Sequence, residues 1–212
     1  MPVEDKVILV GGFKEIIDLC EVCGKTIVGV IDNNISGDFN EYKLLGTDSN
    51  ASDIYKEYND IPLVITPDKP LSRKSLMQYY SSIGFSFASL IHPGAQVSKS
   101  VSFGKGVIIQ TGVHISSNVS IGDFVKLNTY SNIMHDSEVG NFTTVAPNAV
   151  VLGRIKIGEL CYIGANATIL SDIQIAKGVM VGAGAVVTKN VSESKTVAGN
   201  PASILRTYRT RD

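Results

Sequence analysis

Cysteine and net charge are both scarce in this chain, and each scarcity excludes a class of protein. Its 212 residues include three cysteines, an odd number without the spacing of a disulfide framework, which favours a reducing compartment. The formal net charge is −1, so electrostatics gives no reason to expect nucleic-acid or membrane binding. No apolar run is long enough to span a membrane, and the start MPVEDKV lacks the basic segment of a signal peptide. We therefore expect a cytoplasmic protein.

Residues 91–191 repeat with a period of six. Read in sixes from IHPGAQ, VSKSVS and FGKGVI to VGAGAV and VTKNV, every hexad begins with Ile, Val, Leu or Phe, and its fifth residue is small or apolar. A fixed short period is typical of a parallel β-helix. A β-sandwich would instead alternate every second residue and space its turns irregularly. We predict a β-helix domain over residues 91–191.

The period has a geometric cause. Three hexads make one triangular coil of roughly eighteen residues, and neighbouring coils lie about 4.8 Å apart, the ordinary strand spacing. First and fifth residues then point inward, where a charge would be buried without a partner, and none occurs there. Cys161 holds a fifth position and is interpreted as a small core residue. Cys20 and Cys23 have the C-x-x-C spacing, but they lie in an apolar run that we predict to be helical, and we interpret them as packing thiols.

Residues 1–90 are predicted to form a small Rossmann-like α/β domain. Apolar runs without alternation are typical of the buried strands of a parallel sheet. We predict strands at 6–10, 26–31, 62–66 and 85–90, helices at 13–23, 52–58 and 70–83, and a loop over 32–46. Ligands of such sheets bind beyond the carboxyl ends of the strands, near the first βα turn. Gly11, Gly12 and Phe13 form that turn, and Asp32 and Asn33 end the next strand.

This turn is a candidate nucleotide site. Backbone N–H groups at the start of the helix could face a phosphate or a base edge, and Asp32 could accept from a ribose hydroxyl or a base N–H. GGFKEI is not the G-x-G-x-x-G fingerprint, so a full dinucleotide site is not expected. A purely structural turn is the alternative. At the other end of the chain, residues 192–212 are expected to cap the solenoid, with a short helix over ILRTYR.

The chain resembles the bacterial sugar acyltransferases, which include nucleotide-amino-sugar N-acetyltransferases and sialic acid O-acetyltransferases. The likeness covers nearly the whole chain, and its most specific parts are NTYSNIMHDSEVGN, VGAGAVVTKNV and AGNPA. It implies a left-handed coil, acetyl-CoA as co-substrate and a homotrimer with active sites between adjacent β-helices. The catalytic His of the family, which an acid follows, matches His135 and Asp136.

His135 holds the third position of its hexad, at a corner, and Gly153 comes one coil later at the same corner. Gly153 could let its backbone N–H approach the acetyl carbonyl, and the resemblance assigns that position to acetyl-CoA. A neutral imidazole can take a proton as the tetrahedral intermediate forms, and Asp136 can hold its tautomer. Apart from Ser137, at an inward position, no Ser or Cys lies beside His135, so we expect direct attack by the acceptor. Without the resemblance, His135 also fits a plain polar corner residue.

Further candidate contacts come from the place of residues in the coil or in the first βα turn and, for the CoA arm, from the resemblance. Asn128 is a candidate acceptor contact, and Gly12, Phe13, Asp32 and Asn33 are candidates for the nucleotide. The later coils bind the CoA arm in the family, and they supply Gly164, Ala165, Gly182, Ala183 and Lys189. For all of these, turn and core roles are the alternative.

The chain departs from the family at two positions. Many members carry GxxGH after the first strand, where this chain has Gly11-Gly12-Phe13-Lys14. Many also have a second His in the next coil, where this chain has Thr144. The first departure leaves the manner of nucleotide binding open, and the second weakens any role for another imidazole near the thioester.

Three other functions are possible for a hexapeptide-repeat chain. A zinc hydratase of the γ-carbonic-anhydrase type also uses a hexapeptide helix, but His92, His114 and His135 fall on different coils, and the outer two lie roughly 11 Å apart along the axis. A silent trimeric scaffold and an O-acetyltransferase of sialic acid are the other two. We predict a metal-free N-acetyltransferase that acts on a UDP- or dTDP-linked 4-amino-dideoxy sugar for surface glycan (lipopolysaccharide) synthesis.

Overall fold

The computed structural model describes residues 5–205. Its backbone contacts divide the chain into two compact units, Met1–Pro93 and Gly94–Asp212, which are described one at a time. Within residues 5–205, no helix has both the length and the apolar character that crossing a membrane requires.

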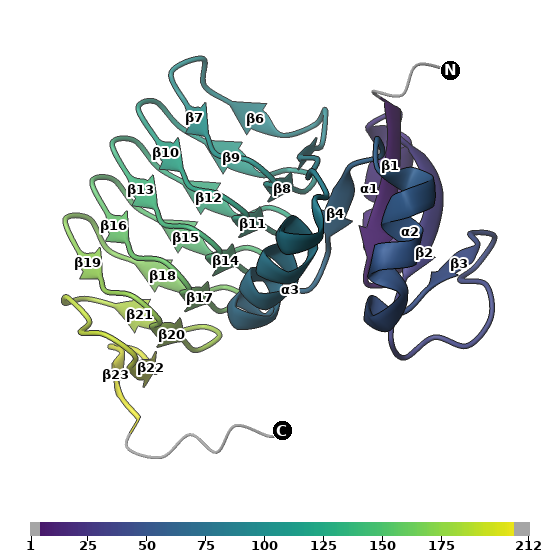
Figure 1. The fold of residues 1–212 in the computed structure, drawn as a ribbon. Coiled ribbons are helices and arrows are strands. Elements are labelled where there is room, and N and C mark those ends of the chain that lie inside the picture. Colours follow the sequence, from purple (N-terminus) through teal and green to yellow (C-terminus); the bar gives the residue numbers. More distant parts are fainter. Residues whose placement is uncertain (1–4, 206–212) are drawn as a thin grey trace. The chain divides into compact units, whose positions relative to one another are not determined.

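The first unit is a parallel sheet with helices (Figure 1). Its elements are β1 (Lys6–Val10), α1 (Lys14–Val22), β2 (Thr26–Ile31), β3 (Leu44–Gly46), the 3₁₀ helix η2 (Asp48–Asn50), α2 (Ala51–Tyr58), β4 (Leu63–Ile65), α3 (Pro70–Ile83) and β5 (Leu90–Ile91). The four-stranded sheet has the order β3-β2-β1-β4, with β1 in the centre, as in one half of a doubly wound fold. The central strand is buried, which explains why its sequence does not alternate.

Two predictions for this unit were wrong. The loop expected over 32–46 contains β3, a three-residue edge strand whose neighbour Lys43 accepts a hydrogen bond from Val30 N at 2.9 Å. So short a strand has no readable period. The strand expected at 85–90 is reduced to a single bridge between Phe87 and Leu63, and β5 begins only at Leu90.

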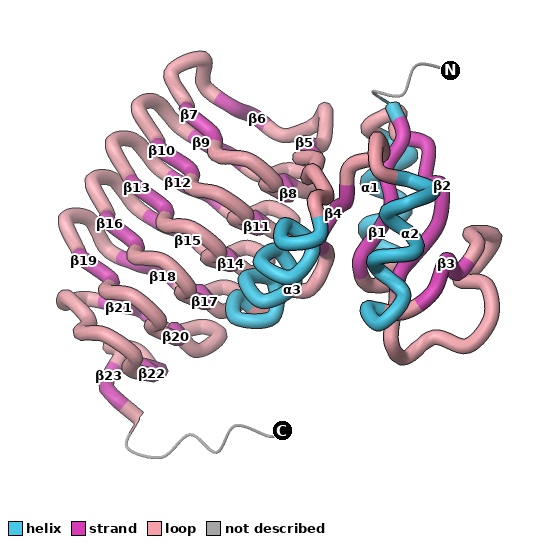
Figure 2. Tube along the Cα trace, viewed as in Figure 1, coloured by secondary structure: helices cyan, strands magenta, loops and turns pink. Residues whose placement is uncertain are grey.

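The second unit is a parallel β-helix, in which short strands are joined by turns (Figure 2). Its strands are β6 (Gln96–Val97), β7 (Ser102–Phe103), β8 (Ile108–Ile109), β9 (His114–Ile115), β10 (Ser120–Ile121), β11 (Lys126–Leu127), β12 (Asn132–Ile133), β13 (Glu138–Val139), β14 (Thr144–Val145), β15 (Val150–Val151), β16 (Lys156–Ile157), β17 (Tyr162–Ile163), β18 (Thr168–Ile169), β19 (Gln174–Ile175), β20 (Met180–Val181), β21 (Val186–Val187), β22 (Thr196–Ala198) and β23 (Ser203–Ile204).

Three sheets form the sides of the coil. We name them by one member each: the β12 sheet (β6-β9-β12-β15-β18-β21), the β13 sheet (β7-β10-β13-β16-β19) and the β14 sheet, to which the second unit contributes β8-β11-β14-β17-β20-β22-β23. Every hexad starts on the second residue of a strand, and the partner of Ile133 in β15 is Val151, the same hexad position one coil later. The apolar first and fifth residues of the hexads from Val107 to Val191 form one continuous core, and Ala95, Val97, Val101 and Phe103 pack against it partly buried. The predicted inward positions are therefore confirmed except at Ile91, the first residue of the first hexad, which is 39% exposed.

The fourth residue of nearly every hexad has a left-handed backbone. Asn118, Asp136 and Arg154 have φ angles of 57°, 58° and 58°, although none is glycine. This conformation turns the chain at each corner, and it explains why Asn, Asp and Gly are frequent there.

The C-terminal end differs from its prediction. The hexads end at Val191, but β22 continues the β14 sheet in parallel with β20. The short helix expected over ILRTYR is wrong for its two described residues, because Ile204 belongs to β23, which pairs antiparallel with β22, and Leu205 is not helical. Residues 206–209 of that helix lie outside the described residues. The hairpin satisfies backbone groups of the last coil, which a helix at this place would leave unpaired.

Candidate functional site

His135 lies in the turn that joins the β12 sheet to the β13 sheet. We call this turn and its equivalents in other coils the His135 corner. His135 Nδ1 lies 2.8 Å from Asp136 Oδ2. Since a carboxylate can only accept, Nδ1 carries the proton and donates, which leaves the lone pair of Nε2 available as a base. The two side chains are 44% and 48% exposed, so a substrate can reach them.

The Asp136 carboxylate has a second partner. Asn118, one coil earlier, donates from Nδ2 to Asp136 Oδ1 at 3.1 Å. The hydrogen bonds from His135 and Asn118 hold the pKa of the Asp136 carboxyl below its usual range. Asp136 is therefore a fixed anion that orients the imidazole and can stabilise its protonated form.

Gly153 stacks on His135, as the repeat predicts. A Cβ atom at Gly153 would lie 2.7 Å from both Cε1 and Nε2 of His135, closer than real Cβ contacts. Glycine at this position leaves room for the imidazole. The structure therefore explains why residue 153 is glycine. The predicted contact of the Gly153 N–H with an acetyl group stays a prediction.

Ser137 and Arg154 complete the corner. Ser137 is fully buried, donates to Leu152 O at 3.1 Å and accepts from Ile155 N at 3.1 Å, so its hydroxyl ties two coils together and does not face the site. Arg154 forms two hydrogen bonds with Asp172, at 2.7 and 2.9 Å. Sequence reasoning missed Asn118, Arg154 and Asp172, although the separation of eighteen residues that located Gly153 also links these pairs.

The other predicted residues of the β-helix divide between two corners. Lys189 follows β21 and lies at the His135 corner, exposed. Asn128 follows β11, at the corner between the β14 and β12 sheets, which we call the Asn128 corner. Four predicted CoA residues lie at this second corner, after β17 and β20: Gly164, Ala165, Gly182 and Ala183. Within one chain, the structure therefore does not bring Asn128 or these four residues to His135.

Asn128 and Thr144 are both buried. The side chain of Asn128 is 4% exposed, and Thr144, which replaces the second His, is 0% exposed. In the chain as described, neither is open to solvent. Among residues 5–205, no three His, Cys, Asp or Glu side chains gather in a way that could hold a metal ion.

A pocket of about 220 Å³ lies at the carboxyl ends of the strands in the first unit. Its lining residues are Val10, Gly11, Phe13, Ile31, Asp32, Asn33, Asn34, Asp48, Pro67 and Leu76. Three of the four predicted nucleotide residues line it, and the fourth, Gly12, donates its backbone N–H to Asp32 Oδ2 at 2.9 Å. We call this the strand-end pocket.

The polar groups of the strand-end pocket are hydrogen-bonded to one another. Asp32 also accepts from Asn34 N at 2.7 Å, so its carboxylate joins the two loops after β1 and β2. Asn33 exchanges two hydrogen bonds with Asp48, at 2.6 and 2.9 Å, and Asp48 accepts a third from Tyr80 OH at 2.6 Å. Asp48 was missed because no sequence signal links the turn after β3 to this pocket. In the turn that follows β1, Gly11 has a φ angle of +98°, a left-handed conformation that favours glycine.

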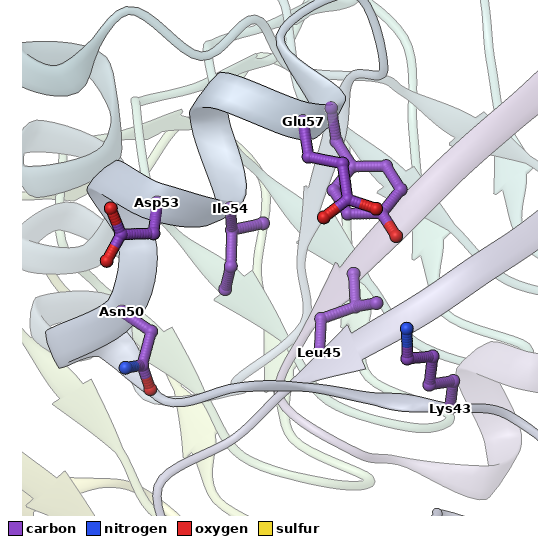
Figure 3. Close-up of a pocket in the computed structure, with 7 residues that line it drawn as sticks. Lys43, Leu45, Asn50, Asp53, Ile54 and Glu57 are labelled. Atoms are coloured by element: carbon purple, nitrogen blue, oxygen red, sulfur yellow. The ribbon is translucent and has the colours of Figure 1, made fainter.

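A second hollow, of about 330 Å³, lies beside the edge strand β3 (Figure 3). Figure 3 shows residues of η2 and α2 facing Leu45 and Lys43 across it. None of the predicted site residues lines this hollow. One of its acids, Asp53, forms an exposed ion pair with Lys56 at 2.8 Å, which is typical of a solvated helix surface.

Comparisons with known proteins agree with the fold. A family model described as bacterial transferase hexapeptide (six repeats) matches residues 154–189. No curated protein sequence matches the chain.

Solved structures match over nearly the whole chain. A mutant of GDP-perosamine N-acetyltransferase from Caulobacter crescentus, in complex with CoA and GDP-perosamine, is 27% identical, with a TM-score of 0.90 and coverage of 95% of this chain and 97% of that one. The acetyltransferase domain of PglB from Neisseria gonorrhoeae, in complex with acetyl coenzyme A, is 27% identical, with a TM-score of 0.88 and coverage of 95% and 99%. WeeI from Acinetobacter baumannii is 30% identical, with a TM-score of 0.82 and coverage of 94% and 100%.

Proposed function

The chain belongs to the hexapeptide-repeat acetyltransferases of the nucleotide-amino-sugar type, and from this premise we propose that it transfers acetyl from acetyl-CoA to the amine of a nucleotide-linked amino sugar. The single observation that carries the proposal is the His135–Asp136 pair. It leaves Nε2 as a base at a half-exposed corner, next to a residue that has no side chain.

The proposed chemistry uses these groups in one direct transfer. The amine nitrogen attacks the thioester carbon, and its proton passes to Nε2 of His135 as the C–N bond forms. Asp136 stabilises the resulting imidazolium through Nδ1. The C–S bond then breaks, and the imidazolium returns the proton to the departing thiolate of CoA. This direct transfer forms no covalent acetyl-enzyme, and the hydroxyl of Ser137, which is buried and hydrogen-bonded to the next coil, is not placed to act as a nucleophile.

The proposed assembly is a homotrimer. Asn128, Gly164, Ala165, Gly182 and Ala183 lie at a different corner from His135. If these residues contact the same substrates as His135, the Asn128 corner must come from a second copy of the chain. This requirement supports the active site between subunits that the family resemblance implies, with Lys189 close to a CoA phosphate.

The proposed acceptor is a 4-amino-dideoxy sugar held through its nucleotide in the strand-end pocket. Phe13, 41% exposed, can stack on a base, and the acceptor-rich lining suits base or ribose donors. The sequence led us to expect UDP or dTDP, whereas the solved relative from Caulobacter crescentus binds GDP-perosamine, so the base is the first thing to determine. The proposed setting is cytoplasmic synthesis of a surface glycan.

The test is CoA thiol release by the purified protein with acetyl-CoA and a panel of acceptors. The panel contains GDP-, UDP- and dTDP-linked 4-amino-dideoxy sugars, free sialic acid, and buffer alone. We expect turnover with one nucleotide amino sugar, and mass spectrometry should show one acetyl group on its nitrogen. Turnover only with sialic acid would make the protein an O-acetyltransferase. Silence throughout, with no acetyl-CoA binding by calorimetry, would make it a scaffold.

A further inference from the structure

We propose that Asn118 and Asp172 are positioning residues for the transfer, and that they keep the Asp136 carboxylate on His135 from opposite sides. Asn118 does so by a direct hydrogen bond, and Asp172 does so by restraining Arg154. The inference rests on the proposed function, because it assigns roles around the same base.

The four side chains form one column along the His135 corner. Asn118, Asp136, Arg154 and Asp172 hold the same hexad position in successive coils, with φ angles of 57°, 58°, 58° and 65°. The backbone of each coil is bonded to the previous one, with Asp136 N donating to Ser117 O at 3.0 Å and Arg154 N to His135 O at 2.9 Å. The side chains therefore leave equivalent points about one strand spacing apart, and each can pair with its neighbour in the column.

Asn118 restricts the rotation of the Asp136 carboxylate. The Asp136 side chain is 48% exposed, and an unrestrained carboxylate at a corner can rotate toward water. The Asn118 amide holds Oδ1 at 3.1 Å, and this leaves Oδ2 at 2.8 Å from His135 Nδ1. The amide is neutral, so it fixes the carboxylate without adding a charge that competes with the imidazole.

Arg154 is the competitor on the other side. Its guanidinium carries a full positive charge one coil from Asp136, and carboxylates prefer such a bidentate partner. Two hydrogen bonds to Asp172, at 2.7 and 2.9 Å, turn it away from Asp136. The charged and titratable groups that bear on Asp136 are therefore His135 and Arg154, with Asp172 behind Arg154. If Asp172 is removed, the Asp136 carboxylate is the acid next to Arg154 in the column, and Arg154 can then pair with it in place of His135.

The kinetic test uses steady-state CoA release. Asn118→Ala should lower kcat about tenfold with KM unchanged. Asn141→Ala should not, because it removes an exposed Asn that accepts from Asp123 N at the third corner, between the β13 and β14 sheets. Asp172→Ala should also lower kcat about tenfold, and adding Arg154→Gln to it should restore most of the loss. A merely structural role for Asp172 gives no such restoration. A kcat of Asn118→Ala within about twofold of wild type, or no recovery in the double variant, overturns the proposal.

A second readout does not depend on turnover. Imidazole ¹⁵N NMR, with the His135 signal assigned from its loss in His135→Asn, should show the Nδ1–H tautomer in wild type and a shift toward Nε2–H in Asn118→Ala. An unchanged tautomer in Asn118→Ala contradicts the proposal even in an active enzyme. A responsive tautomer in a protein that acetylates no acceptor contradicts only the proposed function.

Discussion

The His135 corner and the strand-end pocket are built in opposite ways. At the His135 corner, residues eighteen positions apart touch because the coil repeats, as Asn118 and Asp136 do. In the strand-end pocket, Asp32, Asn33 and Asp48 meet through loops of irregular length. The repeat makes neighbours predictable from numbering alone, whereas the pocket depends on hydrogen bonds that bind one loop to another.

This difference has a consequence for mutation. A substitution at the corner should act along its column and leave the pocket intact, and a substitution in the pocket should weaken nucleotide binding and leave the base intact. The apolar core inside the β-helix is shared by all coils, so a substitution in the core should destabilise the whole β-helix, including the His135 corner.

The largest effect is expected for a charge inside the coil. Ile121→Asp places a carboxylate at an inward position that is 2% exposed, whereas Ser120→Asp places it on the outer face of the same strand. The first should lower the free energy of unfolding by on the order of 4 kcal/mol, because the charge has no partner. Denaturant unfolding measures both. Equal stabilities would show that the first hexad position is not the core.

The next effect concerns the space that Gly153 leaves. Gly153→Ala should push the imidazole off its position and lower kcat about 100-fold, since a shift of about 1 Å at the reacting group has this effect. The KM for the nucleotide sugar should not change. Ser171→Ala, one coil further along the same corner, is the control and should retain wild-type kcat. A fully active Gly153→Ala would mean that His135 does not act from this position.

A substitution in the strand-end pocket should change KM and leave kcat unchanged, the reverse of the effect at Gly153. Asp32→Ala removes the acceptor of Gly12 N and Asn34 N, so the two loops separate and the KM for the nucleotide sugar should rise about tenfold at constant kcat. Asp53→Ala, in the hollow of Figure 3, is the control. If Asp53→Ala raises this KM and Asp32→Ala does not, the nucleotide binds in the second hollow.

The smallest effect is a pH dependence of stability. The pKa of Asp136 is lower in the folded chain than in the unfolded chain, so its contribution is present above the usual carboxyl pKa and is lost as pH falls through the lowered value. The Tm difference between wild type and Asp136→Asn should therefore shrink only below about pH 5, and mostly at pH values under the usual carboxyl pKa of about 3.9. A difference that grows on acidification contradicts the assigned charge state.

The same contrast explains what could be read from the sequence. The period predicted the β-helix, nearly all of its inward residues, and the contact of Gly153 with His135, because a repeat converts numbering into position. The prediction failed for β3 and for Ile204 in β23. Both strands lie outside the hexad repeat, and strands of three and two residues show no period of their own. Asp48 could not be found, because its partners Asn33 and Tyr80 come from separate elements. The left-handed sense of the coil stays an expectation from the resemblance.

The most direct test of the central claim is the kcat of His135→Ala with the acceptor identified by the panel, beside calorimetric binding of acetyl-CoA. We predict a loss of about 1000-fold or more in kcat, within the usual range for removal of a general base, with acetyl-CoA affinity and Tm unchanged. A kcat within about tenfold of wild type would contradict the account, because the corner would then not supply the base.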